Sequence, residues 1–162
     1  PTARGYPPSV FAGIPGILER AGNSDKGSIT AIYTVLVEAD DFNEPISDTV
    51  RSVVDGHIML SRRLAELNHY PAIDILASIS RLMIDIVTPE HLEASKKLRS
   101  LMATYYEAKD LIDVGAYKPG SNAQIDKAIQ MIQPINRFLQ QEIDERSSFE
   151  ESVNQLIKLS QS

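Results

Sequence analysis

Arg81 is the side chain in this sequence whose setting most clearly calls for a chemical partner. It lies near the end of HYPAIDILASISRLM, residues 69–83, a stretch apolar and β-branched enough to predict a buried segment. A guanidinium keeps its charge at any working pH, and burying that charge without an anion is costly. We therefore expect an anion beside Arg81, supplied either by Asp74 or Asp85 of this chain or by another chain.

Other residue types that often do chemistry give weaker signals. His57, His69 and His91 are scattered, with no Asp or Glu in ligand register, which predicts structural or surface roles and no metal site. Tyr70 and Phe138 are, by default, core aromatics. The phosphate-binding pattern G-x-x-x-x-G-K-[ST] does not occur, so any phosphate chemistry needs a phosphate cradle from outside this sequence.

Charge and composition limit the possible partners. The 162 residues include 22 acidic and 16 basic ones, a net charge of −6, with no basic block. This balance predicts protein or nucleotide partners and argues against nucleic acid. Cysteine is absent, which excludes disulfides, and no apolar run reaches the ~18 residues of a membrane span, so we expect a cytoplasmic protein. The chain opens in a loop without methionine, like the middle of a longer polypeptide.

The elements that must position these residues change character near residue 87. Before it, short apolar runs alternate with turn signals, the rhythm of a mainly parallel α/β layer. In the stretch 27–38, apolar residues occupy both odd and even positions, as in a strand that is covered on both faces of its sheet. Three strands are too few for a complete doubly wound domain, so we expect the end of one. The predicted strands are 27–38, 57–61 and 72–76, and the predicted helices are 8–22, 45–55 and 62–70.

Residues 88–162 have helical periodicity almost throughout. Thr88 can cap a long helix with Pro89 at its first position, and one apolar stripe follows. Ser121 and Ser147 have capping-box spacing and predict two further helical stretches, with Pro134 dividing the first of them. A bundle of three or four helices is the natural packing. The stripe consists of Ala94, Leu98, Leu101, Tyr105, Ala108 and Ile112.

Four stretches together resemble one known family. They are ARGYPPSVF, KGSITAIYTVLVEADDFNEPI, DGHIMLSRRLAELNHYPAIDILASISRLM and VGAYKPGSN, in that order, and the resemblance runs from residue 3 to about residue 138. They are similar to the flagellar type III protein export ATPases, also called flagellum-specific ATP synthases. That family is related to the subunits of rotary ATP synthases and to the virulence type III secretion ATPases. GAYKPGSN favours the flagellar branch.

The resemblance implies a fold and an incomplete enzyme. Residues 1–87 should form the C-terminal end of a RecA-like P-loop ATPase domain, and residues 88–162 an all-helical C-terminal domain. In the family, the phosphate loop with its lysine, the magnesium-binding aspartate and the water-activating glutamate precede the part that matches Pro1. The chain is therefore expected to be a C-terminal fragment of an ATP hydrolase, inactive by itself.

The resemblance also assigns roles to three residues. In such ATPases six subunits form a ring with nucleotide at each interface, and the arginine that matches Arg81 enters the neighbour's site as an arginine finger. An ion pair of Arg81 with Asp74 or Asp85 is the structural alternative. Tyr70 is expected against the adenine of the subunit's own nucleotide, and Phe138 near the same base. ATP and Mg²⁺ are the cofactors of the full-length protein.

The implied partners are those of an export machine. Residues 113–126 match the segment that touches the central stalk in rotary relatives, and Tyr117 and Lys118 are expected to project from its tip. Stator components and export chaperone–cargo complexes are further expected partners of a homohexamer at the inner-membrane export gate. Two alternatives are a virulence secretion ATPase and a non-catalytic module that docks chaperones and cargo.

Overall fold

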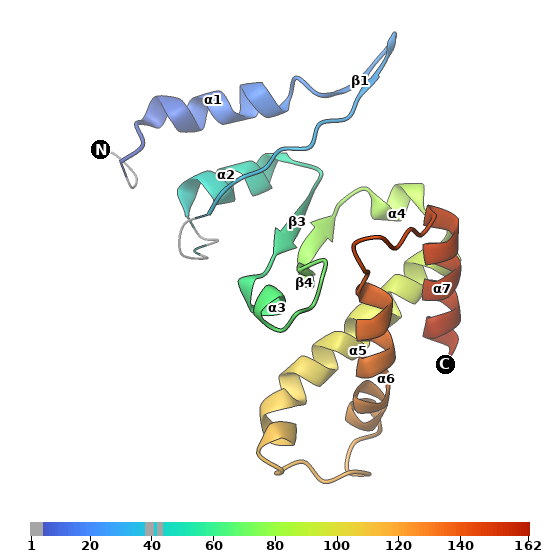
Figure 1. The fold of residues 1–162 in the computed structure, drawn as a ribbon. Helices are drawn as coiled ribbons and strands as arrows, with labels where there is room; N and C mark the ends of the chain where they lie inside the picture. Colours follow the sequence, from blue (N-terminus) through green and yellow to red (C-terminus); the bar gives the residue numbers. More distant parts are fainter. Residues whose placement is uncertain (1–4, 38–40, 42–43) are drawn as a thin grey trace. The chain divides into compact units, whose positions relative to one another are not determined.

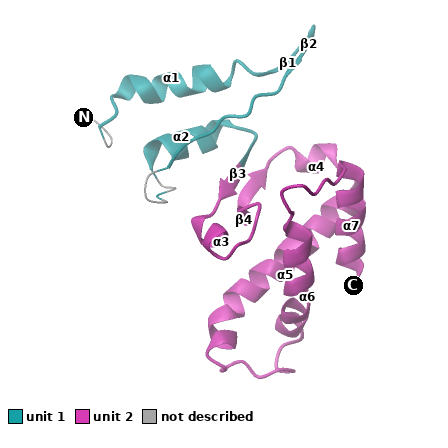
Figure 2. Cartoon of the chain, viewed as in Figure 1, with its two compact units in different colours: residues 1–57 teal, residues 58–162 magenta. Residues whose placement is uncertain are grey.

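The computed structural model describes residues 5–37, 41 and 44–162. These residues form two compact units, residues 1–57 and residues 58–162, which are coloured separately in Figure 2. Each unit is described by itself below. Figure 1 gives the labels of the helices and strands.

The first unit begins with a helix and a small hairpin. Helix α1 (Pro8–Leu18) has proline at its first position, where a missing N–H costs nothing. Pro15 lies inside the helix, which nevertheless continues to Leu18. Strands β1 (Gly22–Ser24) and β2 (Gly27–Ile29) then pair antiparallel, with Gly22 opposite Ile29. The helix over 8–22 predicted from the sequence is confirmed, although it ends four residues earlier.

The predicted strand over 27–38 is wrong beyond Ile29. Residues 30–37 have no regular secondary structure, and Ile32 and Leu36 are 93% and 90% exposed. A strand needs a neighbour for its N–H and C=O groups. The hairpin supplies one only up to Ile29, and the described part of the chain pairs no other strand with this stretch. Glu38 lies outside the described residues.

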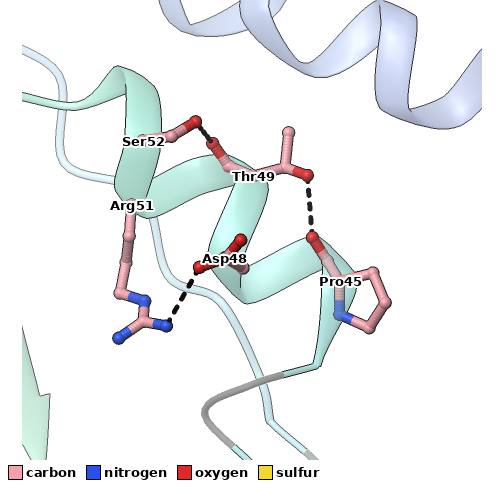
Figure 3. Close-up of polar contacts among 5 residues, drawn as sticks. All are labelled: Pro45, Asp48, Thr49, Arg51 and Ser52. Atoms are coloured by element: carbon pink, nitrogen blue, oxygen red, sulfur yellow. Dashed lines mark hydrogen bonds and ion pairs between the residues drawn. The ribbon is translucent and has the colours of Figure 1, made fainter.

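Helix α2 (Pro45–Val53) completes the first unit and packs against α1. Figure 3 shows its short-range polar contacts: the hydroxyl of Thr49 donates to the Pro45 carbonyl at 2.7 Å, and that of Ser52 to the Thr49 carbonyl at 2.7 Å. Arg51 and Asp48 form an ion pair of 3.4 Å. Such pairs between neighbouring turns contribute only a few tenths of a kcal/mol, about 0.3–0.5, so packing on α1 holds this helix in place.

A two-stranded sheet opens the second unit, although the first two residues of its first strand belong to the first unit. Strand β3 (Gly56–Leu60) is hydrogen-bonded to β4 (Ile73–Ser80), and helix α3 (Arg62–Glu66) lies between them in the sequence. Ser61 caps α3 by accepting the Leu64 N–H at 3.3 Å. The predicted strands 57–61 and 72–76 are confirmed, the second of them longer. Helices and short strands alternate as in the α/β class, but the described strands form two small sheets, of which β1–β2 is antiparallel.

The rest of the second unit is a bundle of three helices, preceded by the short helix α4 (Met83–Ile86). Helix α5 (Pro89–Asp113) packs against α6 (Ala123–Leu139) and α7 (Phe149–Gln161), and α6 also contacts α7 (Figure 1). The predicted stripe faces this core, with Ala94, Leu98 and Ala108 buried. The central cluster consists of Leu98, Met102, Met131, Ile132 and Ile135.

Local signals predicted the helix starts of the bundle to within one residue. Thr88 caps α5 as expected, accepting the His91 N–H at 3.3 Å. Asn122, not Ser121, caps α6, because its short amide reaches two free N–H groups at 2.9 and 3.3 Å. The capping box of α7 uses Ser148 with Glu151. It lies one residue later than the box predicted at Ser147.

Pro134 does not divide α6. The helix is continuous from Ala123 to Leu139 with Pro134 inside it. Met131, Ile132 and Ile135 are buried around this position, and tertiary packing of an apolar face supplies most helix stability in proteins. That packing offsets the missing hydrogen bond. Across the described residues, no helix is both long and apolar enough to cross a membrane.

Candidate functional site

Tyr70 lies between α3 and β4, beside the end of α6. Its side chain is half exposed, with 52% of its surface open to solvent. Its main-chain carbonyl accepts the N–H of Gln141 at 2.9 Å. The preceding residue, His69, is buried and donates its N–H to the Leu64 carbonyl at 2.9 Å. The tyrosine is therefore held by its backbone while its ring remains accessible, and it is not a core aromatic.

Phe138 lies in the last turn of α6, three residues before Gln141. It is half-buried and packs against the central cluster of the bundle. The hydrogen bond between Gln141 and Tyr70 joins the segment after Phe138 to the segment before β4. Two aromatics that are 68 positions apart in the sequence thus lie on neighbouring segments of one compact unit.

Arg81 directly follows Ser80, the last residue of β4. The sequence predicted a buried arginine, and this is wrong: Arg81 is exposed, and neighbouring Ile79 is 51% exposed. Strand β4 has β3 as its one strand neighbour among the described residues, so its end is not enclosed. Arg81 is not without an interaction in this structure, so an internal ion pair stays beside the arginine-finger hypothesis.

The strand that carries Arg81 has irregular hydrogen bonding. The Asp74 carboxylate accepts the N–H of Ala77 at 2.9 Å, and the Ser78 hydroxyl donates to the Asp74 carbonyl at 2.6 Å. Such local bonds are typical of turns, where side chains replace ladder partners. The N–H of Met59, in β3, donates to the Ser78 hydroxyl oxygen at 2.9 Å. Side chains therefore shape β4 just before Arg81.

Arg99, in α5, is a residue that the sequence analysis missed. Its half-buried guanidinium donates to three main-chain carbonyls of β4, those of Ile75, Leu76 (3.2 Å) and Ser78 (3.3 Å). The only sequence signal was a permanent charge next to Leu98 of the apolar stripe. A sequence does not show which main-chain carbonyls accept hydrogen bonds, so the charge of Arg99 could not have identified β4 as its partner.

Tyr106 lies further along α5 and is sensitive to charges from two other elements. Burial raises the pKa of its hydroxyl above the usual value, and the positive charge of Arg63 in α3 partly opposes this shift. The Asp74 carboxylate also acts to raise it. Tyr106 is therefore neutral at working pH, as a tyrosine with an ordinary pKa is as well. The junction of α3, β4 and α5 is therefore a polar one.

Residues 114–122 form a loop, shorter than the predicted loop 113–126 because α5 runs to Asp113 and α6 begins at Ala123, and Tyr117 does not project from it. The residue is half-buried, and its hydroxyl oxygen lies 2.9 Å from an Asp126 carboxylate oxygen and 3.0 Å from the Asn122 carbonyl oxygen. The other Asp126 oxygen accepts the Gly120 N–H at 2.9 Å. Tyr117 therefore organises the loop from inside, whereas Lys118 is exposed.

Comparison with known proteins identifies the relationship. Residues 1–80 match the nucleotide-binding domain of the ATP synthase alpha/beta family, and residues 87–158 match the C-terminal domain of T3SS EscN ATPases. The chain is 52% identical over 159 residues to the flagellum-specific ATP synthase of Bacillus subtilis. The chain is homologous to the flagellar and type III secretion ATPases. The type 3 secretion system ATPase of Xanthomonas euvesicatoria is 51% identical over 156 residues.

Solved structures of these ATPases share the fold. The assembled ATPase EscN of the enteropathogenic E. coli type III secretion system superposes with a TM-score of 0.93 at 51% identity, over 99% of this chain and 39% of EscN. EscN in complex with its central stalk EscO gives 0.85 at 49% identity, over 96% of this chain and 37% of that one. These matches confirm the predicted relationship to the export ATPases. They also confirm the predicted fold class, an α/β nucleotide-binding domain followed by a helical C-terminal region.

The chain spans about a third of the length of these relatives: the alignments cover 98% of it and 36% of the B. subtilis protein, and 96% and 35% for X. euvesicatoria. The first family match ends at residue 80 and the second begins at residue 87. The compact units, in contrast, divide between residues 57 and 58. The predicted domains, 1–87 and 88–162, stay a prediction.

Proposed function

We propose that this chain supplies the arginine-finger strand and the helical domain of a hexameric ATPase that drives flagellar type III protein export. The observation that carries this is the 52% identity to a flagellum-specific ATP synthase along 98% of the chain. Other segments of the proposed enzyme provide the phosphate loop and the catalytic carboxylates, because the phosphate-loop pattern does not occur in these 162 residues. The reaction is hydrolysis of ATP to ADP and phosphate.

Arg81 is the proposed catalytic residue. It is exposed at the end of β4, a position that a neighbouring subunit can reach. A planar, permanently charged fork can donate two hydrogen bonds to the transferred phosphoryl group as negative charge shifts during bond cleavage. Arginine fingers contribute about 10³ to 10⁵ in turnover.

Tyr70 and Phe138 are the proposed adenine contacts. The accessible ring of Tyr70 suits stacking on a base, and the hydrogen bond from Gln141 fixes its segment beside the end of α6. Stacking an aromatic on a base contributes about 1–3 kcal/mol where it has been measured on nucleic acids. Phe138 is half-buried against the core, so it fits an edge contact better than a full stack.

The match of residues 1–80 to a nucleotide-binding domain supports a nucleotide cofactor. No three His, Asp or Glu side chains gather closely enough to hold a metal ion in the described part of the chain. ATP and Mg²⁺ are the proposed cofactors of the complete enzyme. In that enzyme this chain contributes contacts to the base and to the transferred phosphoryl group.

The proposed partners follow from the relatives. EscN forms a complex with its central stalk EscO, and we propose a stalk-like partner for the segment 113–126, with Lys118 rather than Tyr117 as its exposed contact. Stator components and export chaperone–cargo complexes are further proposed partners. The proposed location is the cytoplasm, peripheral to the inner-membrane export gate.

A virulence secretion ATPase is the second candidate. The identities to flagellar and secretion relatives, 52% and 51%, do not separate the two branches. Genetic complementation separates them: a flagellar enzyme should restore motility to a strain lacking its own export ATPase. A protein that only docks cargo would give a different result. The complete protein would bind chaperone–cargo complexes but would not hydrolyse ATP.

The test is the effect of Arg81→Ala in the protein translated from the complete reading frame. Turnover should fall by about 10³ to 10⁵, while nucleotide affinity stays nearly intact, because a finger acts mainly on the transition state. Arg81→Lys should restore little, since an ammonium cannot donate as a planar fork. Unchanged turnover in the alanine variant would instead support the alternative that Arg81 forms an internal ion pair and has no catalytic role.

A further inference from the structure

Arg99 holds the strand that carries Arg81. Its guanidinium donates to three carbonyls of β4, those of Ile75, Leu76 and Ser78. Only an arginine has five donors arranged in one plane, so it can bond several main-chain acceptors at once. These carbonyls belong to a strand with one strand neighbour among the described residues, so the bonds from α5 add to the support that β3 gives this strand.

The contact reaches close to the end of the strand. Ser78 lies three residues before Arg81, a distance of roughly 10 Å at about 3.3 Å per residue. Asp74 and Ser78 already distort this part of β4 through local hydrogen bonds, so the regular ladder does not define its course. The position of Arg81 after the end of β4 therefore depends on the groups that hold the carbonyls of Ile75, Leu76 and Ser78.

The helix that carries Arg99 is anchored in the bundle on both sides of this residue's neighbour Leu98. Neighbouring Leu98 is 4% exposed and belongs to the central cluster that joins α5 to α6. Lys97, on the other side of Leu98, donates its ammonium to the main-chain carbonyl of Ser160 in α7. Arg99 thus connects β4 to a helix whose position is set by the whole bundle.

We propose that Arg99 is a positioning residue that sets the location of the Arg81 guanidinium, an inference that rests on the proposed role of Arg81 as an arginine finger. Arg99 touches no nucleotide and acts only through β4. A displacement of about 1 Å in a catalytic group can reduce turnover about 100-fold without altering substrate binding. Loss of Arg99 therefore reduces kcat and leaves the KM for ATP nearly unchanged.

A double-mutant cycle on the complete protein tests this inference. Arg99→Met keeps the length of the side chain and removes all three hydrogen bonds. With Arg81 present it should lower single-turnover hydrolysis about 10- to 100-fold. In the Arg81→Ala background the same change should have an effect below about twofold, because a residue that acts through Arg81 loses its influence there. Melting temperatures are measured on every variant.

Lys97→Met is the matched control. It removes another bond from a cation on α5 to a main-chain carbonyl, but the acceptor is in α7 and not in β4. It should leave kcat within about twofold, which separates the effect on β4 from a general loosening of the bundle. If Arg99→Met does not fold, Arg99→Lys repeats the cycle, because it keeps the charge and loses the planar fork.

Three results would overturn the inference. If the Arg99 substitution reduced turnover equally with and without Arg81, the role of Arg99 would be merely structural. If the folded Arg99 variants with Arg81 present kept an undiminished kcat, β4 would not need the hydrogen bonds from Arg99. Full turnover in Arg81→Ala alone would overturn the arginine-finger proposal, and the positioning role with it. The last result is recognised without any Arg99 variant, so failure of the two proposals can be told apart.

Discussion

Tyr117→Phe should destabilise the helical bundle by about 1–2 kcal/mol, although it removes a single oxygen atom. That oxygen lies 2.9 Å from the Asp126 carboxylate and 3.0 Å from the Asn122 carbonyl. Hydrogen bonds to charged groups contribute about 1.5–3 kcal/mol, and a half-buried site reduces this through competition with water. Asp126→Ala should cost more, because Gly120 then loses its acceptor as well.

The assay is urea unfolding of this chain followed by circular dichroism. Lys118→Ala is the control: the residue is neighbouring and exposed, and its replacement should change stability by less than about 0.5 kcal/mol. A Tyr117→Phe variant as stable as the Lys118→Ala variant would refute the reasoning. It would mean that Asp126 does not hold the ring and that Tyr117 is available to a partner.

Two further predictions concern this chain alone. Calorimetry with magnesium ATP should detect neither turnover nor tight binding, because the backbone N–H groups and lysine of a phosphate loop are absent from the sequence, and micromolar affinity would contradict this. Hydrogen bonds from the Ser148 backbone and hydroxyl lower the pKa of Glu151 in the folded protein. The ionised carboxylate therefore stabilises the fold above its unfolded-state pKa of about 4.3, and this contribution is lost as the pH falls through the lower folded-state pKa. Glu151→Gln should therefore reduce stability at pH 7 but not near pH 2, and a difference independent of pH would exclude this cause.

Local signals allowed much of the helical part to be predicted. Thr88 followed by Pro89 starts α5, and Pro45 starts α2, because caps and first-turn prolines act within a few residues of themselves. The continuous helix through Pro134 could not be predicted in this way, because distant packing outweighs the local cost of the proline. The stretch 30–37 failed for a related reason. Its composition favours a strand, but a strand exists only with a partner.

The candidate site was predictable to a smaller degree. The resemblance named Arg81, Tyr70 and Phe138, and their roles stay predictions. The structure adds what joins them to their surroundings: the contact of Gln141 with Tyr70 and that of Arg99 with β4. Both contacts use main-chain carbonyls as acceptors. Every residue has such a carbonyl, so residue types alone do not reveal which one is used.

The most direct test of the central claim is whether Arg81 acts on a neighbouring subunit. Two versions of the complete protein are prepared with different tags, one with Arg81→Ala and one with the lysine of its phosphate loop replaced, and each is expected to be nearly inactive. When they are mixed, an intact phosphate loop from one can face an intact Arg81 from the other, so ATP hydrolysis should return. Co-purification through both tags shows that mixed assemblies have formed. Mixed assemblies that stay inactive would contradict an arginine finger acting between subunits.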